Sequence, residues 1–334
     1  MNKARFTRWL EDSWYREMYI APWFTPLSMF YVDVIRLRRW LYGIGILKTS
    51  HFPVPVIVVG NLTVGGTGKT PLVIWLVEQL KQQGYQPGIV SRGYAGKTTS
   101  APQIVTGESQ ASQVGDEAVL LARRCACPVV VHPDRPAAVR HLLSQQACNV
   151  IISDDGLQHY ALARDIEIVV VDGQRRFGNG YCLPTGPLRE PLDRLRQVDF
   201  VVVNGGSDVI EGEITMQCSG DYLVNLLNGE KKRLQDFANQ PCRALAGIGN
   251  PKRFFSQLAN AGLNCESFAF PDHHSFTADD LKFSDNKPLL MTEKDAVKCA
   301  AFAQAHHWYL PIDAELPDHF GASLLTLLNE KTHG

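Results

Sequence analysis

Several features that the chain lacks exclude classes of protein. The formal net charge is −1 over 334 residues, so there is no general basic surplus of the kind that nucleic-acid binding uses, and we expect no nucleic-acid partner. The eight cysteines form no C-x-x-C pair, and no histidine cluster accompanies the nearest pair, Cys125 and Cys127, to complete a zinc site. Free thiols of a cytosolic protein are therefore expected. Without repeats or low-complexity tracts, the length predicts one large or two medium globular domains.

The chain also lacks a clean apolar run that would cross a membrane. Residues 27–47 are apolar overall but contain four charged side chains that are costly at a bilayer centre. These are Asp33, Arg36, Arg38 and Arg39. No small-residue cleavage site follows an apolar core, so the N-terminus does not resemble a secretory signal.

Residues 1–50 are nevertheless unusual in composition. They hold eight Lys or Arg against four acids, and four of the six tryptophans lie in the first 40 residues. Aromatic and basic residues together are typical of a segment at a membrane surface. The alternative is a helix packed on the domain, with its aromatics in the core. We predict that residues 1–50 form a membrane-associated helical segment.

Apolar, β-branched runs alternate with helical patterns over much of the chain. The expected strands of the first part are 56–59, 88–90, 128–131, 149–152, 166–171 and 200–203, and the expected helices start at 69, 113 and 135. This alternation predicts a mainly parallel sheet covered on both faces. A second set comprises strands 243–247, 288–291 and 308–310 and helix 253–261.

The residues between the two sets predict a connection of a different kind. Residues 213–217 and 222–227 alternate apolar and polar side chains around a polar turn, as an antiparallel hairpin does. We therefore expect an α/β protein of two α/β domains: 51–210 with the glycine-rich loop described next, a β-hairpin linker at 211–240, and a smaller domain at 241–334.

A glycine-rich loop follows the first strand and opens a helix. It comprises Thr63, Val64, Gly65, Gly66, Thr67, Gly68, Lys69 and Thr70. Strand, glycine loop and helix start in this order are the context of a phosphate-binding loop, in which backbone N–H groups and the helix N-terminus meet an anion. Lys69 would reach the β- and γ-phosphates, and the Thr70 hydroxyl would ligate Mg²⁺. The loop departs from G-x-x-x-x-G-K-[ST] only at Thr63, and the alternative is a tight turn without a ligand.

Two acids end the strand at 149–152. Asp154 and Asp155 come directly after it, at the carboxyl edge of the sheet, where ligands of open α/β sheets bind. A phosphate-loop enzyme holds its Mg²⁺ with an acid at this position, directly or through water. An acidic turn is the alternative, but the phosphate loop nearby favours a metal site.

Other polar groups are open to two interpretations. Asp116 and Glu117 begin a helix, where acids either stabilise the helix dipole or orient an acceptor hydroxyl. Asp272, His273 and His274 form either a surface loop or a general base with its carboxylate partner. The loops 91–94 and 183–191 present arginines suited to sugar, phosphate or carboxylate groups.

Eight motifs in a fixed order carry a resemblance to a known family. They are residues 63–71 (TVGGTGKTP), 91–94 (SRGY), 115–117 (GDE), 154–159 (DDGLQH), 186–191 (GPLREP), 247–251 (GIGNP), 272–274 (DHH) and 292–298 (TEKDAVK). From about residue 54 to beyond 298, the chain resembles the tetraacyldisaccharide 4′-kinases, the lipid A 4′-kinases of Gram-negative bacteria. In that family Thr63 is the usual loop residue.

The resemblance implies a fold, a reaction and a location. The fold would be two α/β/α sandwich domains, the first like that of P-loop NTPases, with the site between them. The reaction would be ATP- and Mg²⁺-dependent transfer of the γ-phosphate to the 4′-hydroxyl of tetraacyldisaccharide 1-phosphate. The enzyme would lie at the cytoplasmic face of the inner membrane, peripheral or shallowly inserted.

The resemblance also implies residue roles. Lys69 would bind the phosphates, Thr70 with Asp154 or Asp155 would bind Mg²⁺, and Asp116 with His273 would form the catalytic pair. Asp272 and Glu117 would support this pair, and four residues would bind the acceptor head group or shape the pocket: Arg92, His159, Arg189 and Glu190.

Three rival functions differ from this one in their expected residues. A membrane-associated P-loop ATPase switch has a signature lysine where this chain has Val64. A GTPase reads guanine with N-K-x-D, and residues 292–295 (TEKD) lack the asparagine. A non-enzymatic scaffold would not need both the Lys69-Thr70 pair and the Asp154-Asp155 pair.

Overall fold

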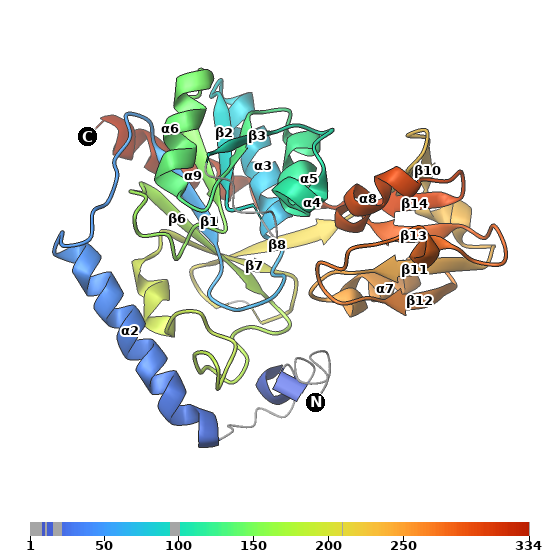
Figure 1. Ribbon diagram of the computed structural model, residues 1–334, viewed down its shortest axis with the longest axis horizontal. Helices are drawn as coiled ribbons and strands as arrows, with labels where there is room; N and C mark the ends of the chain where they lie inside the picture. Colours follow the sequence, from blue (N-terminus) through green and yellow to red (C-terminus); the bar gives the residue numbers. More distant parts are fainter. Residues whose placement is uncertain (1–8, 11, 16–21, 94–100, 209, 334) are drawn as a thin grey trace.

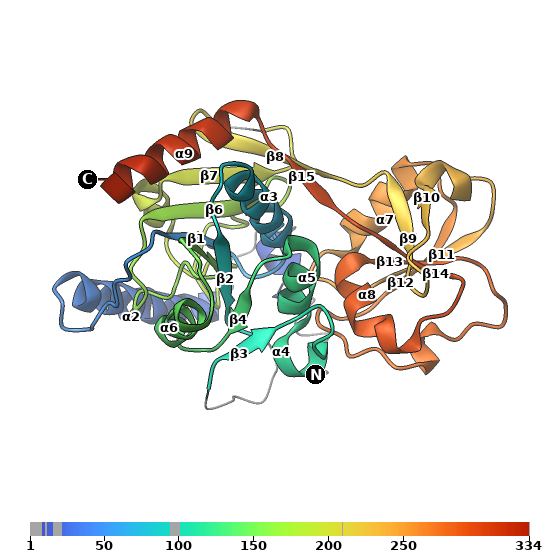
Figure 2. The same ribbon diagram turned by 90° about the horizontal axis from the view of Figure 1, so that it is seen from above.

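The computed structural model describes residues 9–10, 12–15, 22–93, 101–208 and 210–333. The predictions that concern residues 1–8, 11, 16–21 and Tyr94 lie outside this part of the chain. Two sheets lie side by side, each with helices on both faces (Figures 1 and 2). The expected α/β fold with two α/β/α domains is confirmed.

The first sheet has nine strands in the order β15-β8-β7-β6-β1-β5-β2-β4-β3. All neighbours run parallel except the two edge pairs, β3 with β4 and β15 with β8. The strands are β1 (Val56–Gly60), β2 (Pro87–Ser91), β3 (Gln103–Val105), β4 (Val129–Val131), β5 (Val150–Asp154), β6 (Ile166–Asp172), β7 (Phe200–Asn204), β8 (Glu213–Ser219) and β15 (Asp313–Glu315).

Helices cover this sheet on both faces because its strands are apolar on both. In β1, Ile57 and Val59 point into one core with α3, α5 and α9, while Val56 and Val58 point into another with α6. Such doubly buried strands are typical of parallel sheets. The helices of this domain are α2 (Thr25–Gly43), α3 (Lys69–Gln82), α4 (Ala111–Val114), α5 (Asp116–Cys125), α6 (Arg135–Gln145), α9 (Asp318–His333) and the 3₁₀ turns η1 (Pro22–Phe24) and η2 (Leu192–Gln197).

The second sheet has six strands in the order β10-β9-β14-β13-β11-β12. Its strands are β9 (Tyr222–Asn225), β10 (Lys231–Arg233), β11 (Cys242–Ala246), β12 (Cys265–Ala269), β13 (Leu289–Thr292) and β14 (His307–Leu310). Its helices are α7 (Pro251–Asn260), α8 (Glu293–Cys299), η3 (Leu234–Phe237), η4 (Asp279–Leu281) and η5 (Ala300–Phe302). Helix α7 packs on one face and α8 on the other.

The expected β-hairpin linker is wrong. Strand β8 pairs with β7 and β15 in the first sheet, whereas β9 pairs with β10 and β14 in the second. The chain thus crosses from the first sheet to the second between β8 and β9. It returns between β14 and β15, which lie beside them (Figure 2). Local alternation predicted two strands correctly, but it did not identify their partners, which lie about 90 residues further along the chain.

The predicted second domain, 241–334, is also wrong at its C-terminal end, because the last strand and helix belong to the first domain. Strand β15 joins the first sheet, and Phe320, Leu324 and Leu328 of α9 lie in the first domain's core. Phe320 stacks on Trp75 of α3 and meets Phe200 edge-on. The chain therefore returns to its first domain after completing the second. The predicted helix 113–125 is likewise divided at Gly115, whose φ is +97°.

Helix α2 runs along the side of the first domain (Figure 1). Tyr31 and Val32 pack on the core, and the Ser28 hydroxyl donates to the Cys182 carbonyl at 2.8 Å. Many large apolar side chains of this region remain exposed: Trp23, Leu27, Met29, Phe30, Val34, Leu37, Trp40, Ile44 and Ile46. The packed-helix alternative therefore accounts for one side of α2 alone. Among the described residues, no helix is both long and apolar enough to cross a bilayer.

Candidate active site between the two domains

The phosphate loop joins β1 to α3, as its sequence predicts. Gly65 and Gly68 have φ of +104° and +95°, the left-handed region that favours glycine. A Cβ on Gly68 would lie 2.1 Å from Asn204 Nδ2. That amide donates to the Thr67 carbonyl at 2.9 Å, and Asn61 Nδ2 donates to the Thr63 carbonyl at 2.8 Å. The loop is thus held by two buried asparagines in a shape that only glycines permit.

Lys69, the first residue of α3, faces a carboxylate. Its Nζ lies 3.4 Å from Asp155 Oδ1, and Arg189 Nη1 donates to both oxygens of Asp155 at 3.1 and 3.2 Å. Although burial opposes ionisation, Lys69 and Arg189 hold the pKa of Asp155 well below its usual range. Asp155 has φ of +48°, a strained value for a residue with a side chain. The predicted juxtaposition of the loop lysine with the acidic strand end is present.

Asp154, at the end of β5, is almost fully buried. Ser91 Oγ donates to its Oδ2 at 3.3 Å, while Oδ1 has no hydrogen-bond partner among the described residues. Burial, together with the negative charges of Glu117 and Asp155, raises the pKa of Asp154 to about 7. Burial of a carboxylate oxygen without a hydrogen-bond partner costs free energy unless a bound ligand or ion interacts with it.

The donor set here suits Mg²⁺ that arrives with a nucleotide. Mg²⁺ takes one or two carboxylates plus phosphate and water oxygens, and Thr70 in the first turn of α3 and Asp154 supply such hard oxygen donors. Within the described ranges, no three His, Cys, Asp or Glu residues gather as a self-sufficient metal site. The residues present therefore fit a metal ion whose coordination shell is completed by phosphate oxygens.

Asp116 and His273, which are 157 residues apart in the chain, meet across the domain boundary. Asp116 Oδ2 lies 3.3 Å from His273 Nδ1. Asp116 begins α5, and His273 follows β12 in a loop where its φ is +56°. Against the opposing effect of burial, the hydrogen bond with His273 and the charges of Lys294 and Lys298 lower the pKa of Asp116 to about 2. The fold therefore brings the two residues of the predicted pair together.

The supporting acids lie around this pair. Asp272 Oδ2 is 3.7 Å from His273 Nε2. Glu117 Oε1 accepts from Lys294 Nζ at 3.0 Å. His274, the other histidine of the motif, turns to Asp280 instead, with 3.3 Å between His274 Nε2 and Asp280 Oδ2.

A cavity of about 560 Å³ opens beside Asp155 and Glu117. Arg92, His159, Arg189 and Glu190, all predicted support residues, line it. Burial, with Arg135 and Arg92, lowers the pKa of His159 to about 4, so its ring is neutral at pH 7. Helix α2 contributes a wall of the cavity through Tyr31, Val34, Ile35 and Arg38.

Glu190 is a buried residue in the wall of this cavity. It is 1% exposed and accepts a hydrogen bond from Tyr160 Oη at 2.6 Å, while Arg194 Nε lies 3.5 Å from its other oxygen. The Tyr160 ring is surrounded by the guanidinium groups of Arg38, Arg39, Arg164 and Arg194. Glu190 therefore fixes the wall of the cavity through Tyr160.

Sequence reasoning missed several residues of the site. Arg135 is fully buried and donates to the Asp154 carbonyl at 2.7 Å, although its position at the start of an ordinary helix gives no signal. Asn204 is the last residue of β7, and only the fold brings it to the phosphate loop. Lys294 and Lys298 belong to the motif at 292–298, whose residues have no role assigned from the sequence.

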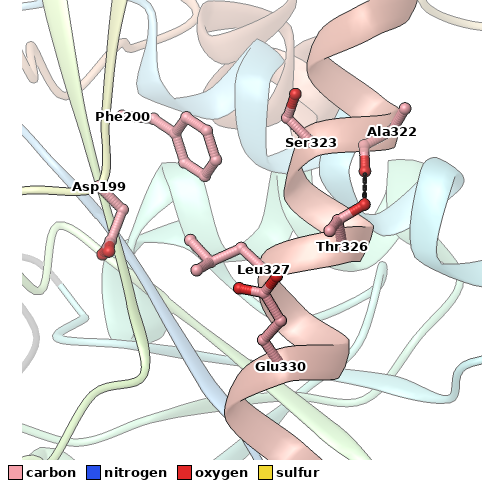
Figure 3. Close-up of a pocket in the computed structure, with 7 residues that line it drawn as sticks. All are labelled: Asp199, Phe200, Ala322, Ser323, Thr326, Leu327 and Glu330. Carbon is pink, nitrogen blue, oxygen red and sulfur yellow. Dashed lines mark hydrogen bonds between the residues drawn. The ribbon is translucent and has the colours of Figure 1, made fainter.

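A second hollow, of about 550 Å³, lies between β7 and α9 (Figure 3). Its lining residues are Asp199, Phe200, Ala322, Ser323, Thr326, Leu327 and Glu330. None of them belongs to the phosphate loop or to the Asp116–His273 pair, so we do not assign the chemistry to it.

Known proteins are similar to this chain in sequence and in fold. Residues 20–329 match the family described as Tetraacyldisaccharide-1-P 4′-kinase. The tetraacyldisaccharide 4′-kinase of Nitrosococcus oceani is 53% identical over 317 residues, covering 95% of this chain and 93% of that one. That of Methylobacillus flagellatus is 49% identical, covering 97% and 96%.

A solved structure extends the likeness to three dimensions. The crystal structure of LpxK from Aquifex aeolicus in complex with ATP is 30% identical, has a TM-score of 0.78, and covers 92% of this chain and 98% of that one. Family membership decides against the switch ATPase and GTPase alternatives. This chain belongs to the tetraacyldisaccharide 4′-kinase family.

Proposed function

We propose a division of labour between the two domains for the reaction of this family. The protein is an ATP-dependent kinase that transfers the γ-phosphate of ATP to the 4′-hydroxyl of tetraacyldisaccharide 1-phosphate, a lipid A precursor. The observation that carries the proposal is the approach of Asp116 to His273 at 3.3 Å from opposite domains, beside the phosphate loop of the first.

The first domain binds the nucleotide. Backbone N–H groups of residues 63–70 and the N-terminus of α3 hold the phosphates. Lys69, whose Nζ lies 3.4 Å from Asp155 Oδ1, would exchange this carboxylate for the β- and γ-phosphates. Thr70 with Asp154 or Asp155 would hold Mg²⁺, which would neutralise charge on the transferring phosphoryl group.

The second domain completes the acceptor side. The 4′-hydroxyl oxygen attacks the γ-phosphorus, the bond from that phosphorus to the β-phosphate oxygen breaks, and ADP leaves. The Asp116–His273 pair takes the hydroxyl proton. Because the pKa of Asp116 is about 2, its carboxylate does not retain a proton at neutral pH, so the proton passes to His273.

Domain closure protects this chemistry from water. Gly249 of the second domain approaches the phosphate loop so closely that a Cβ on it would lie 3.0 Å from Gly66 N. Arg253 of α7 donates to Asn204, which holds the loop from the other side. Closing the site around ATP and acceptor would limit hydrolysis. Scattering that records no compaction with an ATP analogue plus acceptor would count against closure.

The cavity beside the pair receives the sugar headgroup. Arg38, Arg92 and Arg189 line it, and a cluster of guanidinium groups suits an acceptor that carries a phosphate of its own. Asp272 and Glu117 support the pair, and His159 and Glu190 shape the wall.

The test is transfer of label from γ-labelled ATP to the disaccharide lipid in the presence of Mg²⁺. Asp116→Asn and His273→Asn should each lower turnover roughly 10²–10⁴-fold while ATP affinity changes little. His274→Asn is the matched control, because this neighbouring histidine bonds Asp280 instead. Near-normal turnover of either pair variant removes that residue from the mechanism, and phosphate release without labelled lipid refutes the kinase reaction.

Helix α2 supports a proposed location at the membrane surface. Its exposed aromatic side chains and that of the preceding turn, Trp23 at 88%, Phe30 at 66% and Trp40 at 58%, support peripheral attachment to a bilayer, at the cytoplasmic face of the inner membrane. Because α2 also walls the cavity, the acyl chains would stay in the bilayer while the sugar enters the site.

Vesicle flotation tests this attachment. Trp23→Glu with Phe30→Glu should reduce binding to anionic vesicles, as should deletion of residues 1–40. Ile104→Glu, an exposed apolar residue on β3 at the far edge of the sheet, is the control. Unchanged flotation of the helix variants would refute the attachment.

A further inference from the structure

Lys294 forms ion pairs across the boundary between the two domains. It projects from α8 of the second domain, and its side chain is 17% exposed. Its Nζ lies 3.0 Å from Glu117 Oε1 and 3.9 Å from Asp116 Oδ2, both on the first domain, and 3.8 Å from Asp272 Oδ1 on its own. The positive charge of this one lysine thus offsets the mutual repulsion of three carboxylates at the domain boundary.

The helix that carries Lys294 is fixed by its cap. The Thr292 hydroxyl accepts from Asp295 N at 3.1 Å and donates to Asp295 Oδ2 at 2.7 Å. Asp295 Oδ2 also accepts from Gly247 N at 2.9 Å, and Asp295 Oδ1 holds Lys298 Nζ at 2.6 Å. Lys298 is therefore mainly committed within its own domain, at 4.0 Å from Asp116.

The charged neighbours of Asp116 come from the loop after β12, from α8 and from its own helix. His273 approaches from the loop after β12, Lys294 and Lys298 from α8, and Glu117 from its own helix. Of the two lysines, only Lys294 also contacts Glu117 on the first domain, so it is the one that depends on the domains being together.

We propose that Lys294 is a positioning residue of the reaction: it ties the second domain to Glu117 and keeps the Asp116 carboxylate turned toward His273 when the domains meet. This role rests on the proposed function, in which the Asp116–His273 pair takes the acceptor proton. Lys294 has no part in binding ATP, and its effect is exerted through Asp116.

The sign of the expected pH effect follows from the charge. A cation beside the Asp116–His273 pair disfavours addition of a proton to it, so removal of Lys294 raises the macroscopic pKa at which the pair takes up a proton. Lys294→Met should therefore lower kcat at least tenfold and move the acidic limb of the kcat/KM profile upward by about one pH unit. Lys294→Arg, which keeps the charge, should restore most of the activity, and the ATP dissociation constant should not change.

The experiment uses the full chain with vesicle-borne acceptor between pH 5 and 8. Lys282→Met, an exposed lysine of the same domain, is the control for loss of charge. Because Lys294→Met leaves Glu117 without its partner, the double variant Glu117→Gln/Lys294→Met provides a second test with no orphaned charge. It should still show a reduced kcat, with a smaller upward shift of the acidic limb because loss of the Glu117 charge partly offsets loss of the cation.

Asp116→Asn, measured in the same series, separates the two proposals. An active Asp116→Asn would overturn both. If Asp116→Asn is inactive, the role of Lys294 alone is overturned by an unshifted pH profile in Lys294→Met, or by a Lys294→Arg variant as impaired as Lys294→Met.

Discussion

The two halves of the active site are held in place by different forces. The nucleotide half is fixed by buried main-chain hydrogen bonds and a parallel sheet: Asn61 and Asn204 bind the loop carbonyls, and Arg135 binds the Asp154 carbonyl from a fully buried position. The acceptor half reaches the first domain through ion pairs such as Glu117–Lys294. Nucleotide binding therefore needs one domain, whereas transfer needs two domains held together by charge.

This difference has a physical consequence for salt. Ion pairs near the surface weaken as ionic strength rises, while buried main-chain hydrogen bonds do not. Variants at the ion pairs between the domains should therefore respond to salt, and variants of the buried asparagines that hold the phosphate loop should not.

The largest effect is expected at Lys69. Lys69→Met should lower turnover roughly 10²–10³-fold, because a positioned charge on the transferring phosphate is lost. The measurement is single-turnover label transfer at saturating acceptor. Lys81→Met on the same helix is the control, since Lys81 bonds the carbonyls of Cys125 and Ala126 away from the site. Turnover within a few-fold of the unmodified protein would contradict the assignment of the loop.

Gly68→Ala should have the next largest effect. The left-handed φ of +95° and the short distance of 2.1 Å between Asn204 Nδ2 and the new Cβ predict a loss of about 1–3 kcal/mol in unfolding free energy. ATP affinity should fall as well, because the loop must move. Denaturant unfolding and nucleotide titration measure the two effects, with Gly84→Ala, which has a similar φ of +82° but open space, as the control for backbone strain alone. If both alanine variants lose equal stability, the contact with Asn204 contributes nothing.

The same contrast explains how far the sequence could be interpreted. The apolar runs around Val56 and Val150 predict parallel strands because each is buried on both faces, and the loop at 63–70 is local, so its shape follows from its glycines. The linker could not be predicted, because the pairing of β8 with β15 depends on residues far apart in the chain. Arg135 gave no signal, because burial of a charge depends on the carbonyl that the fold places beside it.

The smallest effect is expected at Arg124, which joins the domains away from the chemistry. From α5 it donates to Glu293 Oε2 of α8 at 2.7 Å and also contacts Asp313 of β15. Of its two partners, Asp313 is 54% exposed, so solvent screening weakens that pair. Arg124→Gln should therefore raise the acceptor KM less than about tenfold and leave ATP affinity unchanged, and the difference from the unmodified protein should shrink as salt increases.

Arg123→Gln is the matched control for Arg124, because the neighbouring arginine donates to the Gly107 carbonyl within the first domain. Acceptor KM values measured from low salt to about 0.5 M, where charges are screened within a few ångströms, distinguish the two. A salt-independent defect in Arg124→Gln, or an equal one in Arg123→Gln, would mean that the helix α5 surface matters for packing. Since both variants lose one charge from the same helix, only a salt-dependent defect confined to Arg124→Gln supports ion pairing as the force that brings the second domain to the first.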